Sequence, residues 1–313
     1  MGKRVKKSKR LLLIIEFFLI ILIIGSGCFF FYYYSKTNGK QTKSSNYQKE
    51  LLNKEKIIKE KDEQINKLEK EKNEYASISK KINSTQNKYF EIIKKLENDI
   101  KNGKSDKKIA YLTFDDGPYY NTYRVLDILD QYQVKATFFT TSTNGRECYD
   151  NKSEDCFKLY KEYIKRGHTI ANHTYTHGIF NGLYNSVDTF MDAVIKQEEH
   201  IKEQTGGYVP KIVRFPGGSS TAKNLKDPIV EKLRERGYGW VDWNSLDGDG
   251  GSLDSRDQAW NYLVSSLDEN IEVILFHDYN AITTELLGDA IVYMRTNGYL
   301  LLPLFYDSVM VNK

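Results

Sequence analysis

Side chains that can bind a metal ion or move a proton occur in short groups in the second half of this 313-residue chain. Asp115 and Asp116 are adjacent and precede a Gly-Pro turn, so their carboxylates point in different directions and can do different work. His173 and His177 are four residues apart, and a helix would place both imidazoles on one face, where they could bind one metal ion.

Two further groups add a cation and a third imidazole. Arg214 precedes a Pro-Gly-Gly turn, so its guanidinium could pair with a carboxylate while the turn offers backbone N–H groups near Gly217. His277 stands at the tip of an apolar run, after the last predicted strand. Each group alone is compatible with a purely structural role. Their occurrence together, each after an apolar run, indicates one site.

The elements that would position these groups alternate between β-like runs and amphipathic helical stretches from residue 109 onward. Strands are predicted at Ile109–Phe114, Lys135–Thr140, His168–Asn172, Lys211–Phe215, Tyr238–Trp243 and Glu272–Phe276. Helices are predicted at Asn121–Tyr132, Phe157–Arg166, Val187–Gln204, Lys226–Arg236, Ser255–Leu267 and Thr283–Asn297. Such alternation indicates an α/β fold with a parallel sheet closed, or nearly closed, into a (β/α) barrel, whose chemistry lies at the carboxyl ends of the strands.

The order and spelling of these groups resemble a known family. The segments TFDDGP, HTYTH, RFPGG, WVDWN and LFHD resemble the five motifs of the polysaccharide deacetylases, the NodB-homology group or carbohydrate esterase family 4. The resemblance covers roughly Ile109 to Phe305. It implies a distorted (β/α) barrel and a hydrolase that removes N-acetyl groups from the amino sugars of glycans. It also implies a divalent metal, most often zinc, with cobalt, manganese and nickel as alternatives.

The resemblance implies a role for each motif residue. The metal ligands would be Asp116, His173 and His177. Asp115 would be the catalytic base, Arg214 would hold Asp115 in place, and His277 would be the general acid. Such a set agrees with amide hydrolysis, which needs a base for the attacking water and an acid for the amine that leaves.

Two departures from the family pattern affect the substrate groove. Gly217 stands where many members have a tyrosine, which removes one wall of the groove, but its backbone N–H could still contact the substrate. In the fourth motif, Asp247 follows Trp243 by four residues rather than three. Trp243 could pack beside the acetyl group or belong to the core. The partner that orients His277 could be Asp242, Asp247 or neither. Gly217, Trp243 and Asp242 are therefore the substrate-binding candidates.

The first 34 residues are typical of an uncleaved signal anchor. Residues 1–10 carry six basic side chains and no acidic one. Residues 11–34 contain a single charge, Glu16, and would form a transmembrane helix of about 36 Å, enough to cross a bilayer core of about 30 Å. The basic flank predicts a cytoplasmic amino terminus and an extracellular catalytic domain. A cleaved signal peptide is the alternative.

Residues 35–108 would form a helical spacer and linker before a catalytic domain at 109–313. Apolar residues recur there every seven positions in two registers three residues apart, as a coiled coil requires: Leu51, Ile58, Ile65, Ile93 and Ile100 in one, and Leu68, Tyr75, Ile82, Tyr89 and Leu96 in the other. The first register lapses between Ile65 and Ile93. The pattern therefore predicts either a homodimeric coiled coil or a single charged helix.

Two cysteines lie in the predicted catalytic domain. Cys148 and Cys156 could form a disulfide on an oxidising cell exterior, with two free thiols as the alternative.

The net charge of +4 is unevenly distributed along the chain. It is the sum of 26 − 13 = +13 in residues 1–108 and 20 − 29 = −9 in residues 109–313. The basic excess would face anionic lipid and wall polymers, and no nucleic-acid partner is expected.

Together these observations predict a membrane-anchored, cell-surface N-deacetylase of peptidoglycan, acting on N-acetylglucosamine or N-acetylmuramic acid. One alternative keeps the fold and changes the substrate to an N-acetylglucosamine exopolysaccharide or an O-acetylated glycan. Another makes the protein an inactive glycan-binding surface scaffold. The complete set of motif residues argues against that last alternative.

Overall fold

The computed structural model describes residues 26, 52–66, 88–142 and 154–305. The chain divides into two compact units, 1–83 and 84–313. In the first unit, Ser26 is helical and residues 52–66 form a helix whose large apolar side chains are exposed. No helix within the described ranges is long and apolar enough to cross a membrane. The predicted anchor (Ser26 apart), much of the predicted heptad pattern, Cys148 and the side chain of Cys156 lie outside the described part.

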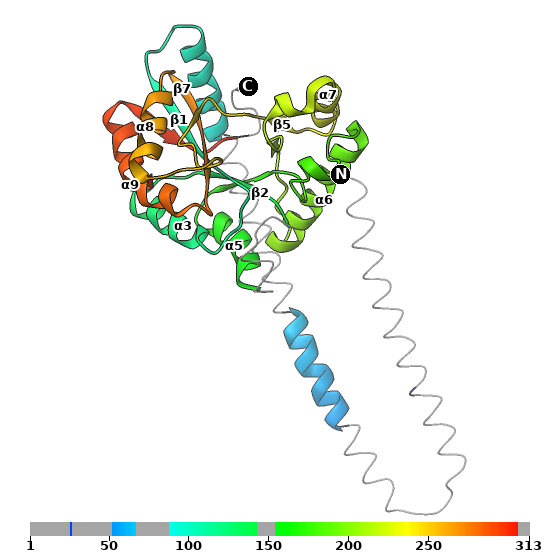
Figure 1. Cartoon of the computed structure of the whole chain (residues 1–313). Helices are drawn as coiled ribbons and strands as arrows, with labels where there is room; N and C mark the ends of the chain where they lie inside the picture. The colour runs from blue at the N-terminus through cyan, green and yellow to red at the C-terminus, as the bar shows by residue number, and fades with distance from the viewer. Residues whose placement is uncertain (1–25, 27–51, 67–87, 143–153, 306–313) are drawn as a thin grey trace, which may run out of the picture. The chain divides into compact units, whose positions relative to one another are not determined.

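An eight-stranded sheet lies at the centre of residues 84–313, and all of its recorded pairings are parallel (Figure 1). The order is β5-β4-β3-β2-β1-β7-β6, and β8 pairs with the first half of β1. The strands are β1 (Lys108–Asp115), β2 (Thr137–Thr140), β3 (Thr169–Asn172), β4 (Ile212–Val213), β5 (Gly239–Trp240), β6 (Ser245–Leu246), β7 (Ile271–His277) and β8 (Tyr299–Leu302). All six predicted strands are present, whereas β6 and β8 were not predicted.

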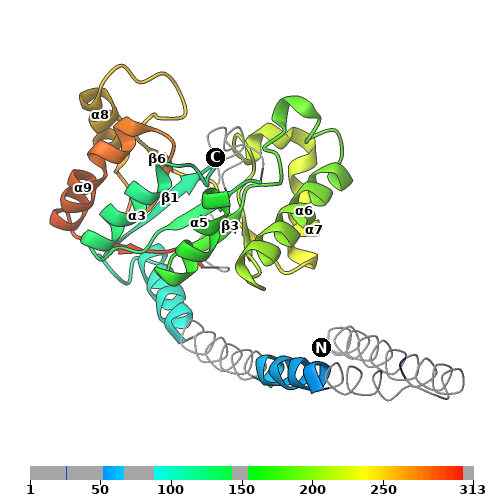
Figure 2. The same cartoon turned by 90° about the horizontal axis from the view of Figure 1, so that it is seen from below.

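Helices cover the outside of this sheet (Figure 2). They are α3 (Thr122–Gln131), α5 (Glu154–Lys165), α6 (Val187–Thr205), α7 (Lys226–Glu235), α8 (Arg256–Ser266) and α9 (Ala281–Thr296), with two short 3₁₀ helices, η1 (Ile179–Asn181) and η2 (Ser219–Leu225). Helices α3, α8 and α9 lie along one side and α6 and α7 along the other. Ser186, Ser255 and Asn280 cap α6, α8 and α9 by accepting backbone N–H hydrogen bonds.

The sheet curls into a barrel that the chain itself closes at one seam. The two edge strands, β5 and β6, are consecutive in sequence and are joined by residues 241–244 instead of by a strand pairing. At this seam, Val241 N donates to Val213 O and Asn244 N donates to Val273 O. This arrangement confirms the predicted distorted (β/α) barrel.

Alternation along β1 decides which of its side chains reach the interior. Ile109 and Tyr111 pack in the cluster inside the barrel, whereas Ala110, Leu112 and Phe114 pack under the outer helices. The same period of two directs Asp115, the last residue of the strand, inward. The neighbouring strand β7 is in register with β1 and places His277 directly opposite Asp115. Two of the predicted site residues are therefore adjacent at the carboxyl end of the sheet.

A helix of residues 88–101 closes the other end of the barrel. Ile93, Glu97 and Ile100 are buried, and Ile100 packs with Ile109 and Tyr111 in the interior cluster. The Tyr111 hydroxyl donates a hydrogen bond to the Glu97 carboxylate. The predicted catalytic domain starts at Ile109, but the compact unit of the structure already begins at Ser84. Seven-residue spacing marks an apolar face on any helix, and here that face packs against the chain's own barrel.

Candidate active site

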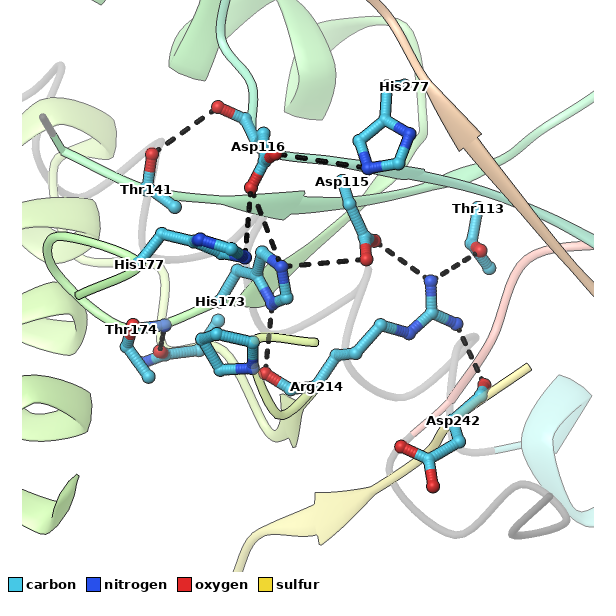
Figure 3. A network of polar contacts seen from close by, with 12 residues as sticks. Thr113, Asp115, Asp116, Thr141, His173, Thr174, His177, Arg214, Asp242 and His277 are labelled. Carbon is cyan, nitrogen blue, oxygen red and sulfur yellow. Dashed lines mark hydrogen bonds and ion pairs between the residues drawn. The ribbon is translucent and has the colours of Figure 1, made fainter. Parts of the chain in front are cut away.

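Asp116, His173 and His177 converge at the carboxyl ends of β1 and β3 (Figure 3). Their potential ligand atoms all lie within 4.8 Å of one another. Asp116 Oδ1 is 3.6 Å from Nε2 of His173 and 3.6 Å from Nε2 of His177. Asp116 has a left-handed backbone, φ 71°, and this turns its side chain away from the direction that β1 gives to Asp115. The two adjacent carboxylates therefore face different partners, as expected.

The segment that carries the histidines is a loop, and the helical face suggested by the four-residue spacing is absent. Thr174 and His177 have left-handed conformations, with φ 65° and φ 51°, which a helix does not allow. The loop begins with an Asx-type turn, in which Thr174 N donates to Asn172 Oδ1 at 2.9 Å. A tight turn thus brings the rings together, with their centroids 4.9 Å apart.

The protonation states in the Asp116, His173 and His177 group suit the binding of a divalent cation. Burial, followed by the charge of His177, lowers the pKa of His173 to about 3, so its imidazole is neutral. Its Nδ1 lies 2.9 Å from Arg214 O, and a proton donated there leaves the Nε2 lone pair facing Asp116. Asp116 Oδ1 is buried and has no hydrogen-bond partner among the described residues. A carboxylate oxygen with an open side, next to two imidazoles, is the donor set of a catalytic zinc site.

Arg214 holds Asp115 from inside the barrel. Its Nη1 donates to Asp115 Oδ1 at 2.8 Å and to Thr113 Oγ1 at 2.7 Å. Its Nε and Nη2 donate to the carbonyls of Val241 and Asp242, the seam residues, at 3.2 and 3.0 Å. Burial raises the pKa of Asp115, and the Arg214 guanidinium opposes that rise. The other carboxylate oxygen, Oδ2, lies 3.6 Å from His173 Nε2 and so faces the candidate metal position.

His277 is oriented by Asp249, a residue that the sequence did not single out. His277 Nδ1 lies 2.7 Å from Asp249 Oδ1, and the His277 backbone N–H donates to Asp249 Oδ2 at 2.6 Å. Burial lowers the pKa of His277, but the hydrogen bond and charge of Asp249 outweigh it and raise the pKa to about 9. The free Nε2 lies 3.8 Å from Asp116 Oδ2. The only sequence signal for Asp249 is its place in the Asp-Gly-Asp-Gly run that follows the fourth motif.

The three substrate-binding candidates have different surroundings. Gly217 is exposed and has a left-handed φ of 73°, as expected for a turn that presents backbone groups. Trp243 is half-buried, with its ring 5.7 Å from the Arg214 guanidinium. Asp242 is fully buried, and both of its carboxylate oxygens bind Ser219, at 2.9 Å to the backbone N and 2.6 Å to the hydroxyl. These two hydrogen bonds fix the first residue of η2 to the Asp242 side chain, and the contact of Asp242 with the substrate stays a prediction.

Comparison of the chain with known proteins identifies its family. The family described as "Polysaccharide deacetylase" matches residues 102–238. A chitin deacetylase of Colletotrichum lindemuthianum is 30% identical over 201 residues, which are 61% of this chain and 75% of that protein. The chain belongs to the polysaccharide deacetylase family. A peptidoglycan-N-acetylglucosamine deacetylase of Bacillus cereus is 29% identical over 211 residues, covering 63% of this chain and 69% of the relative.

A solved structure agrees with the membership. The catalytic domain of a peptidoglycan N-acetylglucosamine deacetylase from Eubacterium rectale is 36% identical, with a TM-score of 0.59 over 66% of this chain and 93% of that one. The chain is accordingly a hydrolase of the polysaccharide deacetylase type, and the family's metal dependence agrees with the Asp-His-His group described above. Within this deacetylase, the strand-end positions of Asp115 and His277 follow directly from the register of β1 with β7.

Proposed function

We propose that this deacetylase is a metal-dependent enzyme that removes N-acetyl groups from N-acetylglucosamine or N-acetylmuramic acid of peptidoglycan. One observation carries the proposal: the Asp116, His173 and His177 group lies between an arginine-held carboxylate and an aspartate-held imidazole. Relatives named for both sugars of peptidoglycan support the substrate class. They include the Bacillus cereus protein above and a peptidoglycan-N-acetylmuramic acid deacetylase of Bacillus subtilis, 26% identical over 201 residues.

The chain's own groups divide the work of amide hydrolysis. A divalent cation held by Asp116, His173 and His177, with zinc as the proposed metal, would supply Lewis acidity toward the acetyl carbonyl and a more acidic water. Asp115 accepts the proton of the attacking water on Oδ2, because Oδ1 is bound to Arg214.

His277 supplies the acid. It approaches the other oxygen of Asp116, and its Nε2 donates the proton that the sugar nitrogen needs in order to leave. Asp249 keeps the Nδ1 side occupied, so Nε2 is the nitrogen that exchanges protons with the substrate. The products are acetate and a free amine, which is cationic at neutral pH. An acidic catalytic region, −9 from 20 − 29 over residues 109–313, suits the release of such a product.

The placement of the enzyme in the cell is also a proposal. Residues 11–34 would anchor the chain in the cell membrane with its amino terminus in the cytoplasm, and the part of residues 35–108 that precedes the barrel-packed helix of residues 88–101 would set the distance of an extracellular catalytic domain from the membrane. The heptad pattern of that preceding part supports a homodimer, and the exterior location supports a Cys148–Cys156 disulfide. The basic anchor flank and the apolar run of the sequence support this arrangement.

Acetate release from a panel of glycans tests the substrate. The full chain with zinc is incubated with purified peptidoglycan, an N-acetylglucosamine polymer and an O-acetylated glycan, and mass spectrometry of the digested wall locates the free amine. We expect acetate from peptidoglycan and an amine on one of its two sugars. Release only from the polymer or only from the O-acetylated glycan would replace peptidoglycan by that substrate. No acetate from any of them, in protein shown to be folded, would contradict the proposal.

A further inference from the structure

A second layer of polar side chains lies behind the general acid. Thr283, in the first turn of α9, places its hydroxyl oxygen 2.7 Å from Asp249 Oδ2 and 2.7 Å from Asp247 Oδ2. Asp247 Oδ1 accepts a hydrogen bond from the Asp249 backbone N–H at 3.1 Å. Asp247 and Thr283 are fully buried, and Asp249 is 3% exposed. Two buried carboxyl groups therefore share one hydroxyl, on the side of Asp249 away from His277 Nδ1.

Counting protons fixes the direction of these hydrogen bonds. A threonine hydroxyl has one proton, so it can donate to only one of two carboxylate oxygens, and a 2.7 Å contact with the other needs a proton on that oxygen. Asp249 Oδ2 already accepts from the His277 backbone N–H, and Oδ1 faces His277 Nδ1, as in an ionised carboxylate. The additional proton therefore belongs to Asp247. The order is Asp247 O–H to Thr283 O–H to Asp249 carboxylate to His277.

The charges around Asp247 agree with this order. Burial, followed by the negative charge of Asp249, raises the pKa of Asp247 to about 8, so the carboxyl is largely neutral at neutral pH. A neutral Asp247 adds no second negative charge beside Asp249. It also occupies the acceptor side of the Thr283 hydroxyl, which leaves the hydroxyl proton for Asp249. A buried carboxylic acid acting as a hydrogen-bond donor is a known use of such a site.

We propose that Asp247 and Thr283 are positioning residues for the general acid, forming a relay that fixes Asp249 against His277. The inference rests on the proposed function, in which His277 delivers a proton to the sugar nitrogen. Neither residue touches the substrate. Their effect is to hold the Asp249 carboxylate in one rotamer and thereby to fix the ring of His277 with Nε2 toward the substrate.

Four variants separate this relay from general packing. Thr283→Val removes the hydroxyl at nearly constant volume, and Thr283→Ser restores it. Asp247→Asn keeps the donor to Thr283 and the acceptor for Asp249 N, because an amide matches a protonated carboxyl. Thr284→Val is the matched control: Thr284 is the next residue of α9 and is also buried, but its hydroxyl donates to Asn280 O at 3.0 Å, outside the relay.

The readouts are kcat and KM for acetate release by the full chain, and the downfield proton resonance of His277 Nδ1–H. We expect Thr283→Val to lower kcat about 10- to 100-fold with little change in KM, and to weaken or shift the resonance. Thr283→Ser and Asp247→Asn should stay within about threefold of the unchanged protein.

Two results would overturn the relay. One is a Thr283→Val variant that matches Thr284→Val in kcat and keeps the resonance. The other is an Asp247→Asn variant that loses as much activity as Thr283→Val, since that would require an ionised Asp247. If Thr283→Val does not fold, two measurements still test the relay: the activity of Asp247→Asn, and the His277 Nδ1–H resonance in that variant and in the unchanged protein. Because the resonance is independent of turnover, absence of acetate release from the unchanged protein would count against the proposed function and leave the relay to be judged by the resonance.

Discussion

Arg214 is a buried cation with four recorded hydrogen-bond acceptors, and no other side chain could replace it without loss. Its donors reach Thr113 and Asp115 on β1 and the carbonyls of Val241 and Asp242 at the seam. The guanidinium also lies over the Phe139 ring, with Cζ 4.1 Å from the centroid. Arg214 thus links the proposed catalytic base, Asp115, to the seam residues that close the barrel. A planar group with fixed donors is required for this, because an ammonium is a point charge.

We predict that Arg214→Lys will cost both activity and stability. Loss of two or three buried hydrogen bonds should lower the free energy of unfolding by about 2–4 kcal/mol, and acetate release should fall at least tenfold because Asp115 loses its fixed partner. Urea unfolding and kcat/KM measure the two effects. Arg295→Lys is the control, since Arg295 is exposed and its Nη2 donates only to Tyr132 O among its recorded hydrogen bonds. Equal behaviour of the two variants would contradict this role.

His168 predicts a pH dependence of stability. Burial, followed by the charge of Lys135, lowers the pKa of this imidazole to about 3, while its Nδ1 accepts a hydrogen bond from Ala136 N at 3.1 Å. The unfolded chain binds the proton near pH 6.5 and the folded chain does not, so His168 costs stability as the pH falls from about 6.5 toward 3. The slope is about 1.4 kcal/mol per pH unit.

The variant His168→Asn isolates this effect. Asparagine can accept from Ala136 N but has no proton to gain, so the difference in unfolding free energy between the two proteins should move in favour of the variant as the pH is lowered from 6.5 to 4.5. Urea midpoints at several pH values measure it. A difference that stays constant over this range would show that His168 takes up its proton in the folded protein.

At the scale of elements, alternation and strand ends explain why much of the site could be predicted. A period of two directs Asp115 inward, and parallel strands bring their carboxyl ends to one edge, so the motif residues on β1, β3 and β7 meet there. Asp249 could not be predicted, because its contact with His277 depends on the course of a loop that has no periodic pattern. The strand β6 could not be predicted because its two residues, unlike those of the equally short β4 and β5, do not lie inside a longer β-like run of the sequence.

The packing of the helix of residues 88–101 is a second feature that the sequence alone does not predict. Its seven-residue pattern favours a coiled coil as much as a buried face, and only the partner surface decides between them. Ile93 and Ile100 are 4% and 7% exposed within the barrel unit, whereas the adjacent Ile92 is 62% exposed. The helix is therefore part of the folded unit, and a fragment that begins at residue 109 would leave the interior cluster uncovered at its open end.

We predict that Ile93→Asp in the full chain will lower the free energy of unfolding of the barrel by about 3–5 kcal/mol, because it removes a buried apolar side chain and buries a charge. Ile92→Asp is a matched control on the exposed face and should change the free energy by about 0.5 kcal/mol or less. Urea unfolding followed by tryptophan fluorescence reports on the barrel, which contains all three tryptophans. Similar losses in both variants would mean that the face is not buried in solution.

In the whole molecule, the near-neutral net charge is the sum of a basic amino-terminal part and an acidic catalytic part. Residues 1–108 carry +13, from 26 − 13, and residues 109–313 carry −9, from 20 − 29. The basic excess begins with the flank of the predicted anchor, where anionic lipid would attract it. The acidic excess belongs to the part that would bind a metal cation and release a cationic glycan. This charge pattern agrees with the proposed orientation, in which the barrel faces the cell wall.

We predict that the full chain will remain in the membrane fraction of its host after a high-salt and alkaline wash. A hydrophobic helix resists such a wash, whereas charge attraction to lipid does not. A chain lacking residues 1–34, mixed with the same membranes, is the control and should be washed off. Release of the full chain by the wash would contradict the proposed anchor.

Metal dependence is tested by titrating metal into the chelated full chain, with acetate release from peptidoglycan as the readout. We predict no release without metal, recovery at about one zinc per chain, and no recovery in His177→Ala, which removes one of the three proposed ligands. Undiminished release after metal removal, or full recovery by His177→Ala at one zinc per chain, would contradict it.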